Sequence, residues 1–347
     1  MFHASRSLCV AVAAGLFGAP PLAANTPPAM LPGVPLVGAL PDDPAAQALD
    51  FGTDATQRMT VPVTIGGTGP YDFIVDTGAE RTVISSQLAR KLGLREGEAA
   101  RLHSMTEVGS VRTVIIPSLE MTRTRVTDIQ APALDGVHLG AVGLLGLDSL
   151  KAQRVVIDFK RGQMTVSPAE RHRALASEPD VIVVSGKSRY GQLILADARV
   201  GPTRIRVIVD TGAQISVANM ALRRKLAGTR RDTGMNPVEL LSVTGGRLDA
   251  GTMVIKQMKV GDVTFTNLPI AFVDAHPFRK FGLANTPALL LGMDALRLFD
   301  RVAVDFTNRE VRFLMPSGAE RNGRAALATN TVHGRDSAPG GLAGESK

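Results

Sequence analysis

The stretch Phe73-Ile74-Val75-Asp76-Thr77-Gly78-Ala79 decides how this chain folds, because a close copy of it recurs. The copy reads Val207-Ile208-Val209-Asp210-Thr211-Gly212-Ala213 and lies 134 residues further along. The same spacing relates several later positions, namely Val83 to Val217, Leu88 to Leu222, and the Arg-Lys-Leu runs at 90–92 and 224–226. Such an internal repeat indicates two copies of one folding unit.

The same series of signals surrounds each copy. A Gly- and Pro-containing cluster before each apolar strand predicts a hairpin, and a short helix is expected after each motif. Later in each half an apolar pair ends in Gly, and an Arg-x-x-x-Asp-Phe strand follows it. In chain order the paired segments are 66–70 and 201–203, 87–92 and 220–226, Leu144-Leu145-Gly146 and Leu290-Leu291-Gly292, and 154–159 and 301–306.

Length and composition agree with two folded units. The chain has 347 residues, of which 44% are apolar and 20% charged, so a mostly disordered protein is excluded. No apolar run reaches the roughly 18 to 20 residues of a membrane-spanning helix. We therefore predict an all-β fold in the main, with two homologous, closed, barrel-like lobes at 51–168 and 181–316, related by a pseudo-twofold axis. A linker is expected at 169–180.

The first 24 residues have the pattern of an export signal. Arg6 precedes an apolar run from Leu8 to Gly18, and small residues lead up to Ala24. We expect cleavage after Ala24, which would remove Cys9, the only cysteine. An exported chain without cysteines fits a bacterial periplasm or a secreted bacterial protein. The run is too short for a stable membrane anchor.

Two further segments are expected to be flexible. The lead at 25–50 is rich in Ala and Pro, and the tail at 317–347 has little apolar surface to bury. The sequence leaves open whether the lead is also an inhibitory prosegment.

The chemistry of the repeat lies in its two aspartates. A carboxylate at the end of a buried strand is costly unless the fold uses it. Two such groups in a pseudo-symmetric pair suggest that Asp76 and Asp210 meet. Like-charged carboxylates in contact cannot both ionise comfortably, so one keeps a proton and the other stays charged. The charged member can then activate a water while the protonated member donates to a carbonyl oxygen.

These residues resemble the aspartic peptidases, in the retroviral-protease-like (retropepsin-like) branch that includes bacterial exported members. The resemblance rests on both Asp-Thr-Gly-Ala motifs and on the two apolar-apolar-Gly elements, and it covers about 51–316. It implies two β lobes with a cleft between them and hydrolysis of peptide bonds by Asp76 and Asp210. Both halves lie in one chain, as in pepsin. We expect a monomer, although pairing of each lobe with its twin in a second chain stays open.

The resemblance also implies roles for the residues around the dyad. Thr77 and Thr211 would form a paired grip, Gly78 and Gly212 would shape the loops, and Ala79 and Ala213 match the retroviral pattern. Pepsin-like enzymes usually carry a hydroxyl where these alanines stand. Its absence predicts a less acidic dyad and a mildly acidic to near-neutral optimum.

Substrate contacts are assigned on the same basis. The flap of the first lobe is expected at 105–109, with Thr106 and Glu107, and that of the second at 243–246, with Thr244, Gly245 and Gly246. The acidic residue after the retroviral motif corresponds to Glu80. Its counterpart here is Gln214, so this contact with the substrate backbone is expected in one lobe only.

Other readings find less support. The histidines lack the spacing of a zinc site and no G-x-S-x-G elbow occurs, so we expect no metal or cofactor. The basic run at 223–225 lacks interleaved aromatic residues, which favours a solvated helix face over a nucleic-acid site. Asp148 and Asp294 are expected to cap short helices. Asp158 and Asp305 should pair with Arg154 and Arg301, respectively, on their own strands.

The sequence therefore predicts an exported aspartic endopeptidase whose partners are peptide or protein substrates. The alternative is a peptide-binding or scaffolding protein that kept the two lobes and lost turnover. Two intact motifs favour the enzyme, because a binding module has no need of two buried acids.

Overall fold

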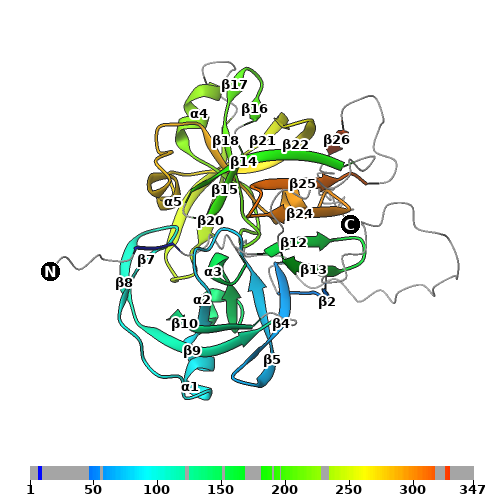
Figure 1. Ribbon diagram of the computed structural model, residues 1–347. Coiled ribbons are helices and arrows are strands. Elements are labelled where there is room, and N and C mark those ends of the chain that lie inside the picture. The colour runs from blue at the N-terminus through cyan, green and yellow to red at the C-terminus, as the bar shows by residue number, and fades with distance from the viewer. Residues whose placement is uncertain are drawn as a thin grey trace, which may run out of the picture.

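The computed structural model describes residues 7–9, 47–54, 58–121, 125–150, 153–168, 181–189, 191–195, 197–227, 234–316 and 325–328. Figure 1 shows two lobes, one built from the first half of the chain and one from the second, with a shared sheet along one side. The protein is mostly β, with two closed six-stranded barrels and a few short helices. The predicted fold class is confirmed.

The barrel of lobe 1 closes through six strands. Their order around the ring is β4, β5, β11, β6, β10 and β9, and β9 pairs back to β4. Alternating burial along β4 turns its apolar side chains into the barrel. The elements of lobe 1 are β3 (Gly52–Thr53), β4 (Met59–Ile65), β5 (Thr68–Val75), β6 (Val83–Ser85), α1 (Ser86–Lys91), β7 (Ala100–His103), β8 (Val108–Val111), β9 (Thr113–Glu120), β10 (Arg125–Leu134), α2 (Gly136–Leu139), β11 (Gly143–Leu145) and α3 (Leu147–Leu150).

Lobe 2 repeats this plan with one interrupted strand. β15 and β16 together occupy the place of β4, since β15 pairs with β18 and β16 pairs with β21. The ring continues through β23, β19 and β22. The elements are β15 (Gln192–Leu195), β16 (Ala198–Val200), β17 (Thr203–Arg204), β18 (Arg206–Val209), β19 (Val217–Ala218), α4 (Met220–Ala227), β20 (Asn236–Leu241), β21 (Arg247–Val260), β22 (Val263–Phe272), α5 (His276–Lys280), β23 (Ala288–Leu291) and α6 (Met293–Leu296).

An antiparallel sheet joins the lobes. Its order is β14, β25, β24, β12, β13 and β2, and the lobes meet where β12 pairs with β24. The register there is reciprocal, with Val156 opposite Ala303 at its centre. The strands are β2 (Gln47–Asp50), β12 (Gln153–Asp158), β13 (Gln163–Pro168), β14 (Val181–Arg189), β24 (Arg301–Asp305) and β25 (Glu310–Leu314).

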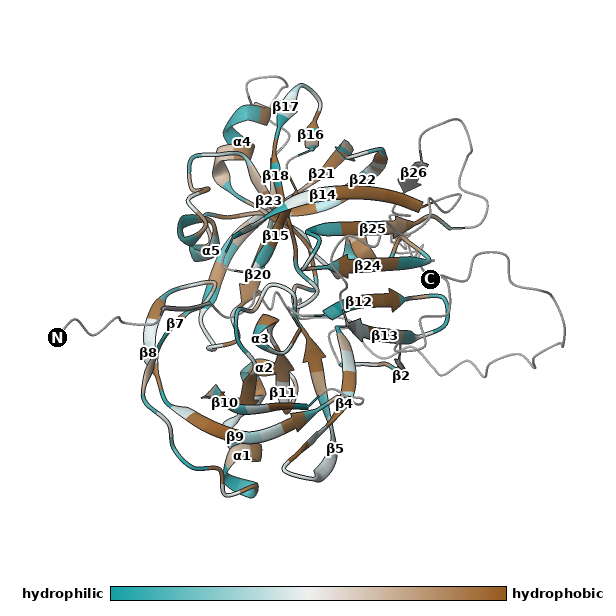
Figure 2. Ribbon diagram, in the orientation of Figure 1, coloured by the Kyte–Doolittle hydropathy of each residue, from teal (hydrophilic) through white to brown (hydrophobic). Residues whose placement is uncertain are grey.

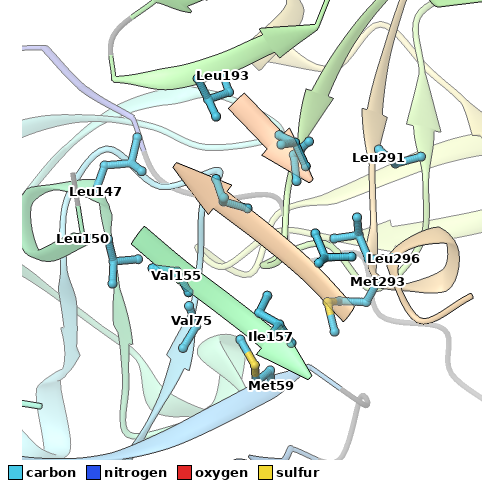
Figure 3. Packing of buried hydrophobic residues seen from close by; sticks show 14 of the residues in the cluster. Met59, Val75, Leu147, Leu150, Val155, Ile157, Leu193, Leu291, Met293 and Leu296 are labelled. Atoms are coloured by element: carbon cyan, nitrogen blue, oxygen red, sulfur yellow. The ribbon is translucent and has the colours of Figure 1, made fainter. Parts of the chain in front are cut away.

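One large apolar cluster runs through this sheet and into both barrels. Figure 3 shows Val155 and Ile157 of β12 near Val75 and Met59 of lobe 1, while side chains of lobe 2, such as Leu296, lie on the other side. Figure 2 shows the hydrophobic colouring concentrated on the strands of both lobes and of the sheet. The lobes therefore share a core and pack as one body.

Two segments expected to be flexible contain strands. Gln47–Asp50 forms β2, which pairs with β13, and Leu49 packs against the main core. Ala325–Ala328 forms β26, which adds in parallel to β22. Short segments can pair with the backbone groups of a sheet strand, which composition alone does not reveal. The remaining parts of 25–50 and 317–347, and the linker at 169–180, lie outside the described residues.

Of the expected signal segment at 1–24, only β1 (Ser7–Cys9) is described, and it pairs in parallel with β7. In the described ranges, no helix has the length and apolar character needed to cross a membrane.

The expected ion pairs form between strands and not within them. Arg154 Nε lies 3.4 Å from Asp305 Oδ2, and Arg301 Nη2 lies 3.2 Å from Asp158 Oδ2. The same-strand prediction was wrong because the antiparallel register places each arginine directly opposite the other lobe's aspartate.

The basic run on α4 is also only partly solvated. Arg224 and Lys225 are exposed, but Arg223 is buried, so the expected solvated face is narrower than predicted.

Candidate active site

The two Asp-Thr-Gly loops start from equivalent strands. Asp76 follows β5 and its N–H donates to the carbonyl of Leu145, while Asp210 follows β18 and donates to Leu291. Each acceptor lies on a short strand that runs parallel to the motif strand, β11 in lobe 1 and β23 in lobe 2. The two apolar-apolar-Gly segments thus run beside and behind the loops, as the resemblance implied.

Thr77 and Thr211 tie the loops together. The backbone N–H of each threonine donates to the hydroxyl of the other, at 3.0 and 3.1 Å. Each hydroxyl in turn donates across the interface to a strand carbonyl, Thr77 to Val209 at 2.9 Å and Thr211 to Val75 at 2.7 Å. This reciprocal network is buried, so it fixes the two loops relative to each other.

The two glycines of the motif let the carboxyl groups approach the opposite loop. A Cβ added to Gly212 would lie 2.1 Å from Asp76 Oδ2, and one added to Gly78 would lie 2.5 Å from Asp210 Cγ. No larger residue fits at either position. The carboxyl groups of Asp76 and Asp210 therefore face each other across the pseudo-twofold axis.

Backbone amides hold the inner oxygen of each carboxyl group. Asp76 Oδ1 accepts hydrogen bonds from the N–H groups of Gly78 and Ala79, at 2.8 and 2.9 Å. Asp210 Oδ1 accepts from Gly212 and Ala213, at 3.0 and 3.2 Å. Asp76 Oδ2 is buried and has no hydrogen-bond partner among the described residues. This oxygen lies against Gly212 of the opposite loop.

Burial makes this pair of carboxyl groups weakly acidic. Removal from water raises the pKa of Asp76 from 3.8 to about 7, although the backbone hydrogen bonds and the Arg58 guanidinium act in the opposite direction. Burial, and next the charge of Asp76, raise the pKa of Asp210 well above its ordinary value. Both shifts favour a shared proton near neutral pH.

Asp148 and Asp294 lie behind the loops and do not cap helices as predicted. Each sits inside the first turn of its short helix, and its carboxyl group accepts a hydrogen bond from a hydroxyl, that of Thr82 in lobe 1 and that of Ser216 in lobe 2, both at 2.7 Å. The prediction was wrong because the helices begin at Leu147 and Met293, two residues earlier than a cap at these aspartates requires. Burial raises the pKa of Asp294 to about 6.

Two hairpins lie where the flaps are expected, and the name flap is kept for them below. β7 and β8 carry the first, whose tip is 104–107, and β20 and β21 carry the second, whose tip is 242–246. Thr106, Glu107, Thr244, Gly245 and Gly246 lie at these tips, and Val108 and Gly109 belong to β8. A Cβ on Gly246 would lie 2.5 Å from Thr106 Oγ1, so the two tips are in contact.

Glu80 and Gln214 occupy equivalent positions below the flaps, and their carbonyl groups accept from the N–H groups of Asp148 and Asp294. The Glu80 carboxylate forms a 2.9 Å ion pair with Lys280 on α5 of lobe 2. In this structure the Glu80 carboxylate therefore binds a side chain of the other lobe.

Sequence reasoning missed several residues beside the dyad. Arg58 is buried, pairs with Asp54 and donates to the carbonyl of Leu139. Gln192, at the equivalent place in lobe 2, donates instead to the carbonyl of Gly78. The spacing of 134 residues aligns these two positions. Their side chains differ, so the repeat did not indicate that either residue lies near the dyad.

The described part of the chain contains no group of three or more His, Cys, Asp or Glu side chains arranged to hold a metal ion. The groups that the structure brings together at this site are the carboxyl groups of Asp76 and Asp210 and the tips of the two hairpins.

A scan against protein-family models places this site in a known family. The aspartyl protease model matches residues 61–149 and 196–295, which together exceed half of the chain. The chain therefore belongs to the aspartyl protease family, and the two matched regions correspond to the two lobes. A search of curated proteins found no match.

Proposed function

We propose that this protein is a single-chain aspartic endopeptidase in which Asp76 and Asp210 share one active site. The main support is that each carboxyl group lies against the glycine of the opposite loop. The hydrogen bonds between the paired threonines hold the two loops in this arrangement. Membership of the aspartyl protease family supports a peptidase. The resemblance implies a cleft between the two lobes, and such a cleft fits cleavage within a peptide chain.

In this proposal the dyad divides two tasks. The ionised member polarises a water for attack on the scissile carbonyl, and the protonated member donates to the carbonyl oxygen and then to the leaving nitrogen. Burial raises the pKa of both Asp76 and Asp210, which keeps one proton on the pair near neutral pH.

The test is cleavage of a peptide library, followed by mass spectrometry, with wild type beside Asp76→Asn and Asp210→Asn. Each isosteric change removes the acid–base pair, so we expect kcat/KM to fall by roughly 10³-fold or more. Internal cuts by wild type alone support an endopeptidase. Equal cleavage by all three proteins would exclude the dyad, and peptide binding without cleavage by wild type would favour a binding protein.

We also propose that the protein acts as an exported monomer in a bacterial periplasm or outside the cell. Export is supported by the signal-like pattern of residues 1–24 and the loss of Cys9 that it implies. A monomer is supported by the pairing of β12 with β24 and of Thr77 with Thr211 within one chain. N-terminal sequencing of the mature protein and light scattering on the active fraction test the two proposals separately.

A further inference from the structure

The two flap tips cross over and rest on opposite lobes. Met105, at the tip of the first flap, is buried in an apolar cluster of lobe 2 that includes Phe278 and Phe281. Val243, at the equivalent position of the second flap, is buried in a cluster of lobe 1 that includes Leu134 and Leu139. The cleft is therefore covered from both sides.

The first flap is fastened by more than apolar contact. The N–H of His276, at the start of α5, donates to the carbonyl of Met105 at 2.9 Å. His103, on β7, shares a 2.7 Å hydrogen bond between its Nδ1 and the Nε2 of His276, and the two rings stack with centroids 5.0 Å apart. Three contacts thus join this flap to one helix of the other lobe.

The second flap has no such fastening within the described residues. Its tip makes no hydrogen bond to lobe 1 there, although Gly245 lies against the ring of His138. Gly245 has φ +86°, a conformation that glycine adopts easily and that suits a deformable turn. A cavity of about 240 Å³ lies between the two flaps and is lined by both, with Glu107 and Ser110 on the first and Val243 and Thr244 on the second, so it does not distinguish them.

One residue accounts for the missing contacts between histidine rings, while the N–H of His138 donates within its own lobe to Asp135. In this part of the chain the repeat has a spacing of 138, which relates Met105 to Val243 and His138 to His276. The same spacing relates His103 to Leu241. Lobe 1 therefore has the helix-borne histidine that a second fastening would need, but the second flap has no histidine to meet it.

We propose that His103 and His276 are positioning residues that hold the first flap as a fixed wall of the cleft, and that the second flap is the lid that lifts to admit a peptide. This inference rests on the proposed peptidase function. A peptide would then enter this pseudo-symmetric enzyme from one side only, the side covered by the second flap.

Burial, and next the surrounding charges, disfavour protonation of the histidine pair near neutral pH. A hydrogen bond between two imidazoles needs a lone pair on one ring, so double protonation would break it. Burial lowers the pKa of His103 to about 4, and Lys280, His276 and Arg101 act in the same direction while Glu80 opposes them. Burial, Arg279 and Lys280 likewise lower the pKa of His276.

Pulsed electron paramagnetic resonance of spin labels tests the two flaps separately. In a Cys9→Ser background, Ser110→Cys with Arg204→Cys reports the first flap against lobe 2, and Asp249→Cys with Arg90→Cys reports the second flap against lobe 1. All four native side chains are exposed. At pH 7 we expect a narrow distance distribution for the first pair and a broader one for the second.

Substitutions taken from the repeat itself sharpen the test. His103→Leu, which copies Leu241, should broaden the first distribution, and His138→Leu is the matched control that should leave it narrow. Leu241→His should create a second fastening with His138 and narrow the second distribution. If His103→Leu destabilises the fold in a thermal melt, His103→Gln replaces it. Equal widths of the two distance distributions in wild type would overturn the proposal. So would a first distribution that stays narrow when His103 is replaced.

Kinetics supply a second readout. Leu241→His should lower kcat/KM roughly fivefold, chiefly through slower peptide binding, because it fastens the lid. An unchanged kcat/KM with a narrowed distance would contradict the role of the second flap as the lid. If no variant cleaves peptide, the proposed function fails while the distance measurements still decide whether the first flap is fastened.

Discussion

At Asp76, burial works against ionisation. The side chain is fully buried, and two backbone N–H groups and the nearby Arg58 only partly offset the loss of water. In the unfolded chain the same carboxyl group would ionise near 3.8. The folded protein therefore binds a proton at Asp76 over a pH range in which the unfolded chain has released it, and this costs stability as the pH rises.

Asp76→Asn should make the protein more stable at neutral pH. The amide keeps the Oδ1 acceptor for Gly78 and Ala79 and removes the group whose ionisation is penalised. The gain in the free energy of unfolding should be absent below pH 4 and grow between pH 4 and 7. Above pH 7 it should reach on the order of 2–4 kcal/mol. Urea unfolding at pH 4 and pH 8 measures it. A gain that is equal at both pH values would contradict the raised pKa of Asp76.

Ala79 and Ala213, which follow the two Asp-Thr-Gly sequences, lead to a second prediction about single residues. Neither Ala79 nor Ala213 offers a hydroxyl to its carboxylate, and the pKa of Asp76 is raised to about 7. We expect the acid limb of the kcat/KM profile near neutral pH. Ala79→Ser with Ala213→Ser should move this limb to lower pH, by roughly half a unit or more.

The pH–rate profiles of wild type and the double serine variant check this. Ala89→Ser, on α1 and outside the motifs, serves as the control for adding a buried hydroxyl and should leave the limb in place. A wild-type optimum near pH 2 to 3 would count against the inference.

Among the elements, the two active-site loops depend most on each other. Neither loop satisfies its own polar groups, since the hydroxyl of Thr77 and that of Thr211 each bond only to groups of the opposite lobe. The loops are therefore a product of lobe pairing, and we expect them to lose their shape when one lobe is absent.

Thr211→Val should destabilise the protein while Thr211→Ser should not. Valine keeps the shape but leaves the N–H of Thr77 and the carbonyl of Val75 without a partner in a buried place. The free energy of unfolding should fall by roughly 2–4 kcal/mol, measured by urea titration. Serine retains the hydroxyl and should cost less than half of that. Equal losses for both variants would mean that the methyl group, and not the hydroxyl, stabilises the loops.

For the whole molecule, the joining sheet decides whether the lobes unfold together. Arg154 with Asp305 and Arg301 with Asp158 cross the junction of β12 and β24, and all four side chains are largely buried. Loss of one partner leaves a buried charge uncompensated, which costs roughly 3 kcal/mol.

Arg154→Ala combined with Arg301→Ala should therefore weaken the cooperation between lobes. Differential scanning calorimetry should show a single transition for wild type and two separated transitions for the double variant. Arg312→Ala is the matched control, since Arg312 pairs with Glu310 on its own strand and does not cross the junction. A single transition in the double variant would show that the apolar core alone couples the lobes.

Several features could be predicted because they depend on local pattern and repetition. The motif at Asp76 and its copy at Asp210 each end an apolar strand, so their burial follows from sequence spacing. The strand that carries Leu145 was placed behind the first loop by resemblance. Other features depend on register between distant strands. The partners of Arg154 and Arg301 were therefore mistaken, and the meeting of His103 with His276 was not foreseen.

The sequence by itself determined that this protein has two equivalent β lobes, each with one Asp-Thr-Gly loop, because a repeated pattern of apolar and turn residues dictates the same local structure twice. Only the tertiary structure decided how the copies differ. Pairing across the lobes gives Glu80 a lysine partner and gives the first flap a histidine fastening that Leu241 denies to the second. Such differences arise from contacts between residues far apart in the chain, and no local pattern encodes them.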